Sequence, residues 1–475
     1  MNQKMIVIEL NEADKYFLDK FSNQDQLPYF KHLLSKGVLI PTTISSWNAS
    51  AENAWRDISP WIVWPSIYTG KKPNEHGIVG FGQESIPLVG ECIWDVLNKQ
   101  GITTGIMSNL LSHPVRYNDY SLFYIPEALA NTPECIPAHL NPIQDFLIYT
   151  ARNYSENFLT SSFTATKKLF TSVKAGLPLS VALQILIQVP LEILKGKAFQ
   201  RNRALLQGKL QMALFLKLLT KYRPQFSTLH MNHIAYMQHR YWRAAEPDKF
   251  KNELSSLDRF LFKSVDKRKR HDLKFKDAIL DAFKVTDQFL GKILPLVTDD
   301  TMLVIMSGLG QKPMDPCGEI HNPEIRLANL DKLLLLLDIN YVSLLHQMSP
   351  DITITFNSCK DATEASKKIS NILILDEFPL FQTKQVNNQL FLECFLPKEI
   401  WDLNNKIWLS IKETTHHLNF YDFVRVSRVK DQSTAHHKDD GWILLYGNHK
   451  PITTKLDSPT IDITNIKPML INYFN

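Results

Sequence analysis

The sequence has few cysteines, and their spacing organises no fold. Its 475 residues include only five, Cys92, Cys135, Cys317, Cys359 and Cys394, and none of them forms a CxxC pair. An odd number of widely spaced cysteines excludes a readable disulfide framework and a zinc knuckle. We therefore expect reduced thiols and a cytoplasmic protein.

The chain also lacks a large excess of either charge. Lysine and arginine together number 53 and aspartate and glutamate 48, so the net charge is 53 − 48 = +5. The longest basic tract is Lys267-Arg268-Lys269-Arg270. Nucleic-acid-binding domains concentrate far more positive charge on one face, and we expect no nucleic-acid partner.

No segment has the pattern of an export signal or a membrane span. The apolar run Met5-Ile6-Val7-Ile8 has no basic region or cleavage site before it, which predicts no export signal. The most apolar stretch, residues 176–194, contains two prolines and carries a polar residue at every fourth position, namely Ser180, Gln184, Gln188 and Glu192. A bilayer span would bury that polar stripe. We interpret the stretch as a cap or core helix, and an interfacial amphipathic helix is the alternative that leaves membrane association open.

What the sequence does contain is a recurring pattern of short apolar runs between helical segments. With 44% hydrophobic and 21% charged residues, the chain can bury several sizeable cores. The runs lie at residues 5–10, 104–108, 226–231, 302–306 and 442–446. Such runs are typical of buried parallel strands. We predict an α/β fold: a doubly wound, mostly parallel sheet with helices on both faces.

Two segments interrupt this pattern. Residues 141–222 have helical spacing without strands, and we predict a helical cap insert there. Residues 345–426 have a β-α-β-β order with a hairpin around Val386-Asn387-Asn388, which predicts a small α+β insert. The α/β core would then comprise residues 1–140, 223–344 and 427–475.

Polar residues follow several of the predicted strands. Ligands of parallel α/β sheets bind at the carboxyl ends of the strands. The residues at these ends are Asn11, Glu12 and Asp14 after the first run, Asn232, His233 and His239 after the third, and Ser307, Gly308, Gly310 and Gln311 after the fourth. His436, His437, Asp439 and Asp440 precede the last run, so they join the same edge only if that strand is antiparallel. We expect Asn11, Glu12, Asn232, His233 and Gln311 to contact a ligand.

The most distinctive segment is residues 59–78, SPWIVWPSIYTGKKPNEHGI. It resembles the W-P-S-x-x-T-G-x-x-P-x-x-H-G-I run of the alkaline-phosphatase superfamily, in the branch of type I phosphodiesterases and nucleotide pyrophosphatases. Residues 7–14, 94–97, 238–242, 306–310 and 461–470 resemble further motifs of that branch, in the same order. The resemblance implies an alkaline-phosphatase-like fold and a small-molecule phosphate or sulfate ester as the substrate.

The resemblance also implies a metal centre, because enzymes of the branch hold two divalent metals roughly 4 Å apart. Matched residue by residue, the expected ligand positions are Asn11, Ala235, His239, Gly308, Leu309 and His437. The two histidines are retained and every matched aspartate is missing. Carboxylates bind divalent metals and offset their charge, so we expect no two-metal centre. A rebuilt site for one metal of Zn or Mn type would use His239, His437 and Glu12, which is better placed than Glu9 inside the strand.

The position of the nucleophile stays open. The family's Ser/Thr corresponds to Pro60, and a shift of one residue places it on Ser59, at the start of a predicted helix where backbone amides favour a phosphoryl oxyanion. Ser59 followed by Pro60 is equally a common helix opening with Ser59 as the N-cap. Ser66 is a fallback that is more typical of a packing residue, and His76 is more typical of a turn-fixing residue.

Two functions are compatible with these residues. In the first, the chain is a hydrolase or transferase of phosphate diesters, phosphate monoesters or sulfate esters, with Ser59, His239 and His437 as the catalytic residues. In the second, it is a catalytically inactive family member that binds an anionic or phosphorylated ligand. We favour the enzyme, because both retained histidines belong to the same metal site. A membrane-docking role of residues 176–194 is compatible with either function.

Overall fold

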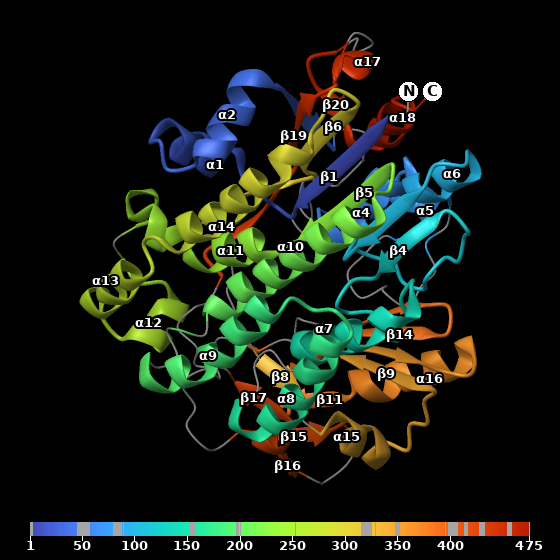
Figure 1. The fold of residues 1–475 in the computed structure, drawn as a ribbon. Coiled ribbons are helices and arrows are strands. Elements are labelled where there is room, and N and C mark those ends of the chain that lie inside the picture. Colours follow the sequence, from blue (N-terminus) through green and yellow to red (C-terminus); the bar gives the residue numbers. More distant parts are fainter. Residues whose placement is uncertain are drawn as a thin grey trace. The chain divides into compact units, whose positions relative to one another are not determined.

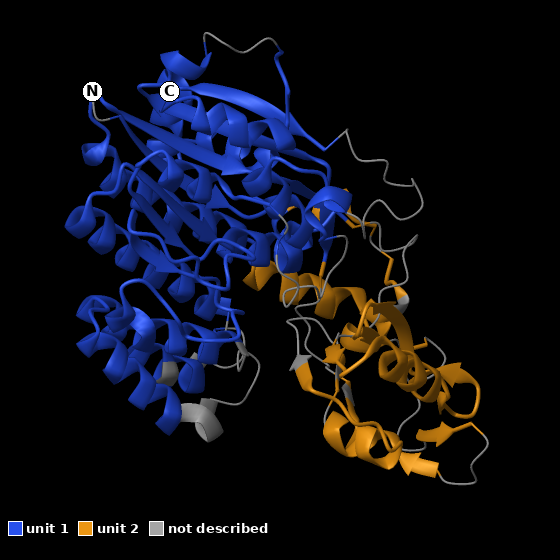
Figure 2. Cartoon of the chain, turned by 90° about the vertical axis from the view of Figure 1, so that its right-hand side faces the viewer, with its two compact units in different colours: residues 1–245, 276–313, 434–475 blue, residues 246–275, 314–433 orange. Residues whose placement is uncertain are grey.

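The computed structural model describes residues 3–44, 58–78, 88, 90–152, 158–195, 199, 201–251, 253–314, 325–327, 329–346, 352–394, 396–397, 407–412, 417–426, 433–453 and 458–474. Figure 1 shows the elements in sequence colours, and Figure 2 shows the two compact units that they form. Unit 1 comprises Met1–Ala245, Lys276–Pro313 and Thr434–Asn475, and unit 2 comprises Glu246–Phe275 and Met314–Ser433. The helical segment 141–222 groups with the sheet in unit 1, whereas residues 246–275 group with unit 2.

Unit 1 is built on an eight-stranded sheet with the strand order β20-β2-β19-β6-β1-β5-β3-β4. The strands are β1 (Lys4–Leu10), β2 (Val38–Thr43), β3 (Thr104–Met107), β4 (Ser121–Ile125), β5 (Phe226–Met231), β6 (Thr301–Ser307), β19 (Asp440–Gly447) and β20 (Ile461–Asp462). All pairs are parallel except those of β19 with β2 and β6. The predicted α/β class with a mostly parallel sheet is confirmed. The five predicted runs are strands, and β2, β4 and β20 were not predicted.

The antiparallel direction of β19 decides where its preceding loop lies. Trp442, near the start of β19, pairs with Ser307, the last residue of β6. The residues before β19 therefore lie at the carboxyl ends of the parallel strands. There, β18 (Ala435–Lys438) forms a two-stranded ladder with β7 (Gly310–Pro313), and the register places His437 opposite Gln311.

Helices cover both faces of this sheet. Successive side chains of β1 point to opposite faces, so its apolar residues pack against helices on each side. Met5 and Val7 belong to a core shared with α4 (Pro60–Thr69), α6 (Ile93–Lys99) and α18 (Ile466–Ile471). A second group of helices packs together on the other face, and α10 and α14 cross the near side of the sheet in Figure 1. This group consists of α1 (Lys15–Asn23), α2 (Pro28–Lys36), α10 (Asn202–Tyr222), α11 (His233–Ala245) and α14 (Ala278–Ile293).

The helical segment leads from the sheet into α10. Its helices are α7 (Asn141–Arg152), α8 (Phe158–Lys174) and α9 (Leu179–Lys195). α8 packs against α7 and α9, and α9 packs against α10. None of the helices in the described part of the chain combines the length and apolar content that a bilayer span requires.

Unit 2 contains two small antiparallel sheets with the orders β13-β14-β10-β9 and β12-β11-β15-β16, and a β17-β8 pair. Its strands are β8 (Ile325–Leu327), β9 (Ser343–His346), β10 (Ile352–Thr355), β11 (Ile372–Ile374), β12 (Phe378–Pro379), β13 (Phe381–Val386), β14 (Gln389–Cys394), β15 (Trp408–Ile411), β16 (His417–Asn419) and β17 (Val424–Val426). Its helices are α12 (Ser256–Phe262), α13 (Val265–Lys274), α15 (Leu330–Leu336) and α16 (Cys359–Ser370). The β-α-β-β order expected from the sequence corresponds to β10, α16 and the β13–β14 hairpin, with β11 and β12 in between.

His76, at the end of the short helix α5 (Pro73–His76), is buried in unit 1. Its Nδ1 accepts a hydrogen bond from the backbone N–H of Ile78 at 3.2 Å, and its Nε2 lies 2.9 Å from Ser66 Oγ. Since Ser66 Oγ donates to the Ile62 carbonyl, the neutral ring completes the arrangement by donating from Nε2. Burial lowers the pKa of His76 to about 4.

We predict that His76 destabilises the fold in mild acid. The unfolded imidazole has a pKa near 6.5, so the unfolded state binds the proton first as the pH falls. The free energy of unfolding then decreases between about pH 6.5 and the folded pKa of about 4, by at most about 1.4 kcal/mol per pH unit for this proton. Denaturant titrations across this range should show a shallower decrease for His76→Gln. His139→Gln, at an exposed histidine, should keep the wild-type slope. Identical slopes for all three proteins would contradict the assignment.

Candidate functional site

The site is built on the turn that ends β1. Glu12 has a left-handed backbone conformation with φ +54, which costs a residue with a side chain roughly 1–2 kcal/mol. Such strain persists only where the surroundings hold it. Gln238 of α11 does so, because its Nε2 donates to the Glu12 carbonyl at 2.7 Å and its Oε1 accepts from the Asp14 backbone N–H at 3.0 Å. The turn therefore projects the Glu12 side chain in a fixed direction.

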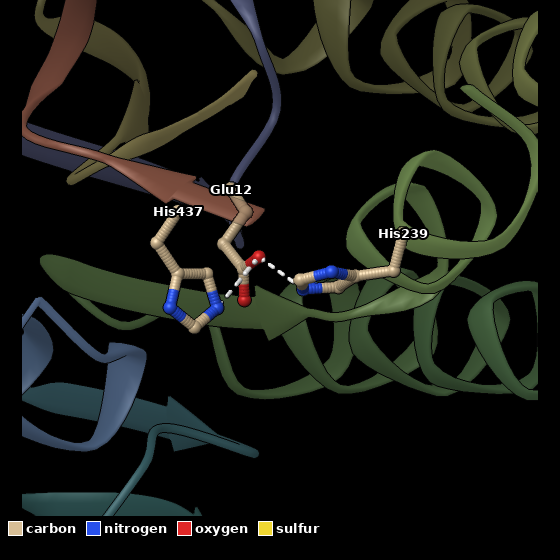
Figure 3. Close-up of side chains that lie close together, drawn as sticks. All are labelled: Glu12, His239 and His437. Atoms are coloured by element: carbon tan, nitrogen blue, oxygen red, sulfur yellow. Dashed lines mark ion pairs between the residues drawn. The ribbon is translucent and has the colours of Figure 1, made fainter. Parts of the chain in front are cut away.

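The carboxylate of Glu12 lies between two histidines from distant parts of the chain (Figure 3). Its Oε2 is 2.7 Å from Nε2 of His239 on α11 and 3.2 Å from Nε2 of His437 on β18. One ligand atom from each residue lies within 4.8 Å of the others. The Glu12 side chain is 4% exposed, whereas the His239 and His437 side chains are 29% and 22% exposed. The cluster is thus reached from solvent past the two rings.

Backbone carbonyls fix the orientation of both imidazole rings. His239 Nδ1 lies 3.0 Å from the Ala435 carbonyl oxygen, and the His437 ring hydrogen-bonds the Ile58 carbonyl. A carbonyl only accepts, so the nitrogen facing it carries the hydrogen, and the Nε2 atom is left facing Glu12. A ring that is protonated at Nε2 donates to the Glu12 carboxylate, whereas in a neutral ring the Nε2 lone pair faces the carboxylate and is available to a shared cation. Metal-ligating histidines are typically held by such a second hydrogen bond.

Two amide side chains support the carboxylate. Asn11 Nδ2 donates to Glu12 Oε1 at 3.0 Å, and Gln311 Nε2 donates to Oε2 at 2.5 Å. Burial by itself would raise the pKa of Glu12, but the charges and hydrogen bonds of His437 and His239 outweigh it and hold this pKa well below its usual range. Conversely, burial lowers the pKa of His437 and the Glu12 carboxylate outweighs it, so that this pKa is raised. Glu12 is therefore ionised at neutral pH, which is its metal-binding form.

An ion pair joins the β1 turn to the strand that carries His437. Lys438 Nζ lies 2.8 Å from Asp14 Oδ2, which also accepts from the Gln311 backbone N–H at 3.2 Å. The same stretch is tied to α11, because the Thr434 backbone N–H donates to the His239 carbonyl at 2.5 Å. The protein itself thus holds the three donor atoms in place.

Several residues expected at the site lie around this cluster. Asn11 Nδ2 also donates to Asn232 Oδ1 at 2.7 Å, which brings together the ends of β1 and β5. Gln311 contacts Glu12 directly. Ser59 directly follows Ile58, whose backbone carbonyl accepts a hydrogen bond from the His437 ring. Its Oγ accepts from the Trp61 backbone N–H at 3.3 Å and caps α4.

His233 and Glu9 make their contacts elsewhere. His233 Nε2 lies 2.9 Å from Thr286 Oγ1 on α14, and its ring is so close to Gly208 of α10 that a Cβ there would be 2.9 Å from Nδ1. The described contacts of His233 are thus with the helix layer and not with Glu12. Glu9 is buried inside the sheet, where Oε2 accepts from the Tyr68 hydroxyl at 2.6 Å.

Two residues that position the cluster were not singled out from the sequence. Gln238 holds the Glu12 turn, and Lys438 joins it to β18. Both sit next to a retained histidine in the chain, and Gln238 also begins the motif at residues 238–242, but neither signal assigned them a role. Long polar side chains beside a ligand position are ordinary on any helix or strand, so the sequence did not distinguish them.

Comparisons with known proteins identify a family for this chain. The family model described as "Type I phosphodiesterase / nucleotide pyrophosphatase" matches residues 5–348. Phosphonoacetate hydrolase from Sinorhizobium meliloti 1021, in complex with phosphonoformate, is 13% identical with a TM-score of 0.42, over 99% of this chain and 95% of that chain. An inactive form of murine ectonucleotide pyrophosphatase / phosphodiesterase 5, in complex with AMP, is 12% identical with a TM-score of 0.37, over 100% of this chain and 95% of that chain. A comparison with curated proteins finds no match.

Asn11, Gly308 and Leu309, which the resemblance matches to further metal ligands, do not fit a cation in this structure. Asn11 is neutral, and its Oδ1 accepts from Trp64 Nε1 at 2.8 Å. A Cβ at Gly308 would lie 2.7 Å from Ile67 Cδ1 and 2.8 Å from Val63 Cγ1, so α4 occupies the space that a ligand side chain would need. Leu309 is fully buried in the same core. The described donor set therefore fits one divalent cation, at Glu12, His239 and His437.

We predict that the chain binds one Zn²⁺ or Mn²⁺ ion and not two. Calorimetric titration of chelator-treated protein should give a stoichiometry of one. Glu12→Gln, His239→Asn and His437→Asn should each weaken binding by at least about tenfold, because each removes one of only three protein ligands. His139→Gln should bind like the wild type. A stoichiometry of two, or wild-type affinity in all three site variants, would contradict this assignment.

We also predict that Gly308 is required by the packing of α4. Gly308→Ala should lower the free energy of unfolding by about 1–3 kcal/mol, because the added methyl overpacks the core against Val63 and Ile67. Val63→Ala in the same chain provides room, so the double variant should be more stable than the sum of the single effects. Denaturant melts of the four proteins measure this coupling. Additive effects would show that the space beside Gly308 is already free.

Proposed function

Because the chain belongs to the family of type I phosphodiesterases and nucleotide pyrophosphatases, we propose that it hydrolyses phosphate esters with one divalent cation held by Glu12, His239 and His437. The observation that carries this proposal is the convergence of one carboxylate oxygen and two imidazole nitrogens at the carboxyl edge of the sheet. Such a mixed N/O set suits Zn²⁺ or Mn²⁺. Three protein ligands leave a coordination position for a substrate oxygen, as in catalytic rather than structural sites.

The rebuilt site differs from the family's arrangement in the source of its carboxylate. Ala235, four residues before His239, offers no ligand atom, and its carbonyl accepts from Gln311 Nε2 at 3.2 Å. Glu12, one residue beyond the expected first-strand position, supplies the carboxylate instead. When bound, a divalent cation would polarise a phosphoryl oxygen and offset the charge that develops during displacement.

Ser59 is the proposed nucleophile. Attack of its Oγ on phosphorus forms a Ser–O–P bond and expels the ester alcohol, and water then hydrolyses the phosphoserine. The Trp61 backbone N–H already donates to this oxygen, which favours its ionised form. The N-terminus of α4 adds further N–H groups and a helix dipole that favour a phosphoryl anion. Asn232, exposed beside Asn11, would present its amide to the same phosphoryl group.

A binding protein without turnover is the second candidate. It is supported by the engagement of Ser59 Oγ as a helix cap and by the apolar packing around Gly308. Elemental analysis separates the two candidates. A stoichiometric metal in the purified protein argues for the enzyme, whereas a metal-free protein that melts at a higher temperature with inorganic phosphate argues for the binding protein.

A series of nitrophenyl substrates defines the ester class. Bis(nitrophenyl) phosphate, nitrophenyl phosphate and nitrophenyl sulfate differ in charge and in the reacting atom, and each releases nitrophenol. We expect metal-dependent turnover of the phosphate esters with added Mn²⁺ or Zn²⁺. Turnover that is unchanged in His239→Asn and His437→Asn would count against the proposed site.

We predict that substitutions of Ser59 separate its capping role from catalysis. Ser59→Asn keeps an N-cap side chain but has no hydroxyl, so the melting temperature should stay close to that of the wild type while kcat falls by about 10³-fold or more. Ser59→Thr keeps both properties and should retain activity. Ser59→Ala should lose about 1 kcal/mol of stability as well as activity.

Ser358→Asn is the matched control for this series. Ser358 caps α16 in unit 2 through the backbone N–H of Asp361 at 3.1 Å, in the way that Ser59 caps α4. This substitution should leave kcat unchanged. If Ser59→Asn also retained wild-type kcat, another group would have to be the nucleophile.

A further inference from the structure

One surface of unit 1 exposes apolar side chains where a globular protein would bury them. We define the α8–α9 face by the exposed residues Phe163, Phe170, Leu179, Leu183, Leu186, Ile187, Ile193 and Leu194. Within the described part of the chain, these eight account for nearly half of the exposed large hydrophobic side chains. Phe163 is 84% exposed and Leu194 80%. Apolar patches of this kind mark contact surfaces.

Polar contacts hold α9 in this orientation. Gln188 is buried, and its Nε2 donates to Glu192 Oε1 at 2.9 Å and to the Phe199 carbonyl at 3.0 Å. Arg203 of α10 pairs with Glu192 through two hydrogen bonds, at 2.9 and 2.7 Å. Gln188 and Glu192, two of the four polar residues that recur along residues 176–194, therefore face α10. The apolar side of α9 is turned outward by an ion pair on its other side.

The segment around this face is strongly basic. Residues 158–223 contain eleven Lys and Arg residues and a single acidic residue, Glu192, so their net charge is 11 − 1 = +10. Since the whole chain has a net charge of +5, the remainder carries 5 − 10 = −5. The positive charge of the protein is thus concentrated in the segment of the sequence that contains α8, α9 and α10.

Several of these lysines lie beside the apolar residues. Lys174 Nζ is 4.6 Å from the centre of the Phe170 ring, and Lys167 is exposed on the same helix. Lys217 of α10 donates to the Gly176 carbonyl at 2.7 Å, in the turn between α8 and α9. Aromatic and aliphatic side chains bordered by lysines are typical of helices that lie in a membrane interface.

We propose that the α8–α9 face docks on a membrane surface that carries anionic headgroups. The apolar side chains would enter the boundary between headgroups and acyl chains, while the lysines stay among the negatively charged headgroups. Charge favours this occupant over a second copy of the chain, because a symmetric dimer would place two strongly basic segments against each other. The inference goes beyond the proposed function and does not depend on it.

Docking would place the site at a defined position above the membrane. α9 packs on α10, and α10 packs on α11, the helix that carries His239. These helices belong to one unit, and α10 links α9 to the helix that carries His239.

Vesicle co-sedimentation of the full chain tests the proposal. The wild type should sediment with vesicles of phosphatidylcholine mixed with phosphatidylglycerol, only weakly with phosphatidylcholine alone, and less at high salt. The double variant Ile187→Gln with Leu194→Gln should lower the partition coefficient on the mixed vesicles by about tenfold. The matched control, Leu335→Gln with Leu336→Gln at exposed positions of α15, should bind like the wild type. Turnover of a soluble nitrophenyl ester should be unchanged in both.

Other outcomes would overturn the proposal. Absence of wild-type binding to the mixed vesicles would do so, as would equal losses in the two double variants. A wild-type dimer that the Ile187/Leu194 variant converts to monomers would assign the face to a second copy. A lower melting temperature of that variant would show that the face is covered within the chain. Lys167→Gln with Lys174→Gln gives a test that leaves the apolar residues intact, and it should weaken binding by about fivefold for each lysine.

Discussion

The Glu12 carboxylate between His239 and His437 is the contact on which the site depends. A buried carboxylate is costly unless charged or hydrogen-bonding groups compensate it. Here two imidazoles and the amides of Asn11 and Gln311 surround its two oxygens. The same contacts join the end of β1, α11 and β18, so the electrostatics of one side chain also hold the geometry of the sheet edge. The left-handed backbone at Glu12 persists because Gln238 binds the backbone of the turn on both sides of this residue.

The neutral side chain of Asn11 follows the same electrostatic logic. An aspartate at position 11 would put a second carboxylate next to Glu12, and two adjacent carboxylates repel each other without a cation to share. Asn11 instead donates to Glu12 and accepts from Trp64, which couples the turn to α4. Gly308 then allows Val63 and Ile67 to pack against the strand end. Hydrophobic packing thus takes the volume that a second cation and its ligands would need.

The sequence predicted those features that depend on short-range pattern. Apolar runs such as 302–306 identified buried strands, and the position after β1 made Glu12 a better ligand than Glu9, whose side chain is inside the sheet. It did not reveal that His233 turns toward Thr286, because helical spacing does not say which neighbouring helix a side chain meets. The outward orientation of α9 depends on Arg203 from another helix, and β2 contains Pro41, which weakens a strand pattern.

The order of Glu12, His239 and His437 along the chain has a consequence for biosynthesis. Glu12 is translated first, His239 near the middle, and His437 only after all of Met314–Ser433 has been made. In the nascent protein, β1 can pair with β5 as soon as β5 has been made. The β7–β18 ladder, which carries His437, can form only after residues Met314–Ser433 have left the ribosome. A translation product that is stalled before His437 would therefore contain the centre of the sheet without the third side chain of the Glu12–His239–His437 cluster.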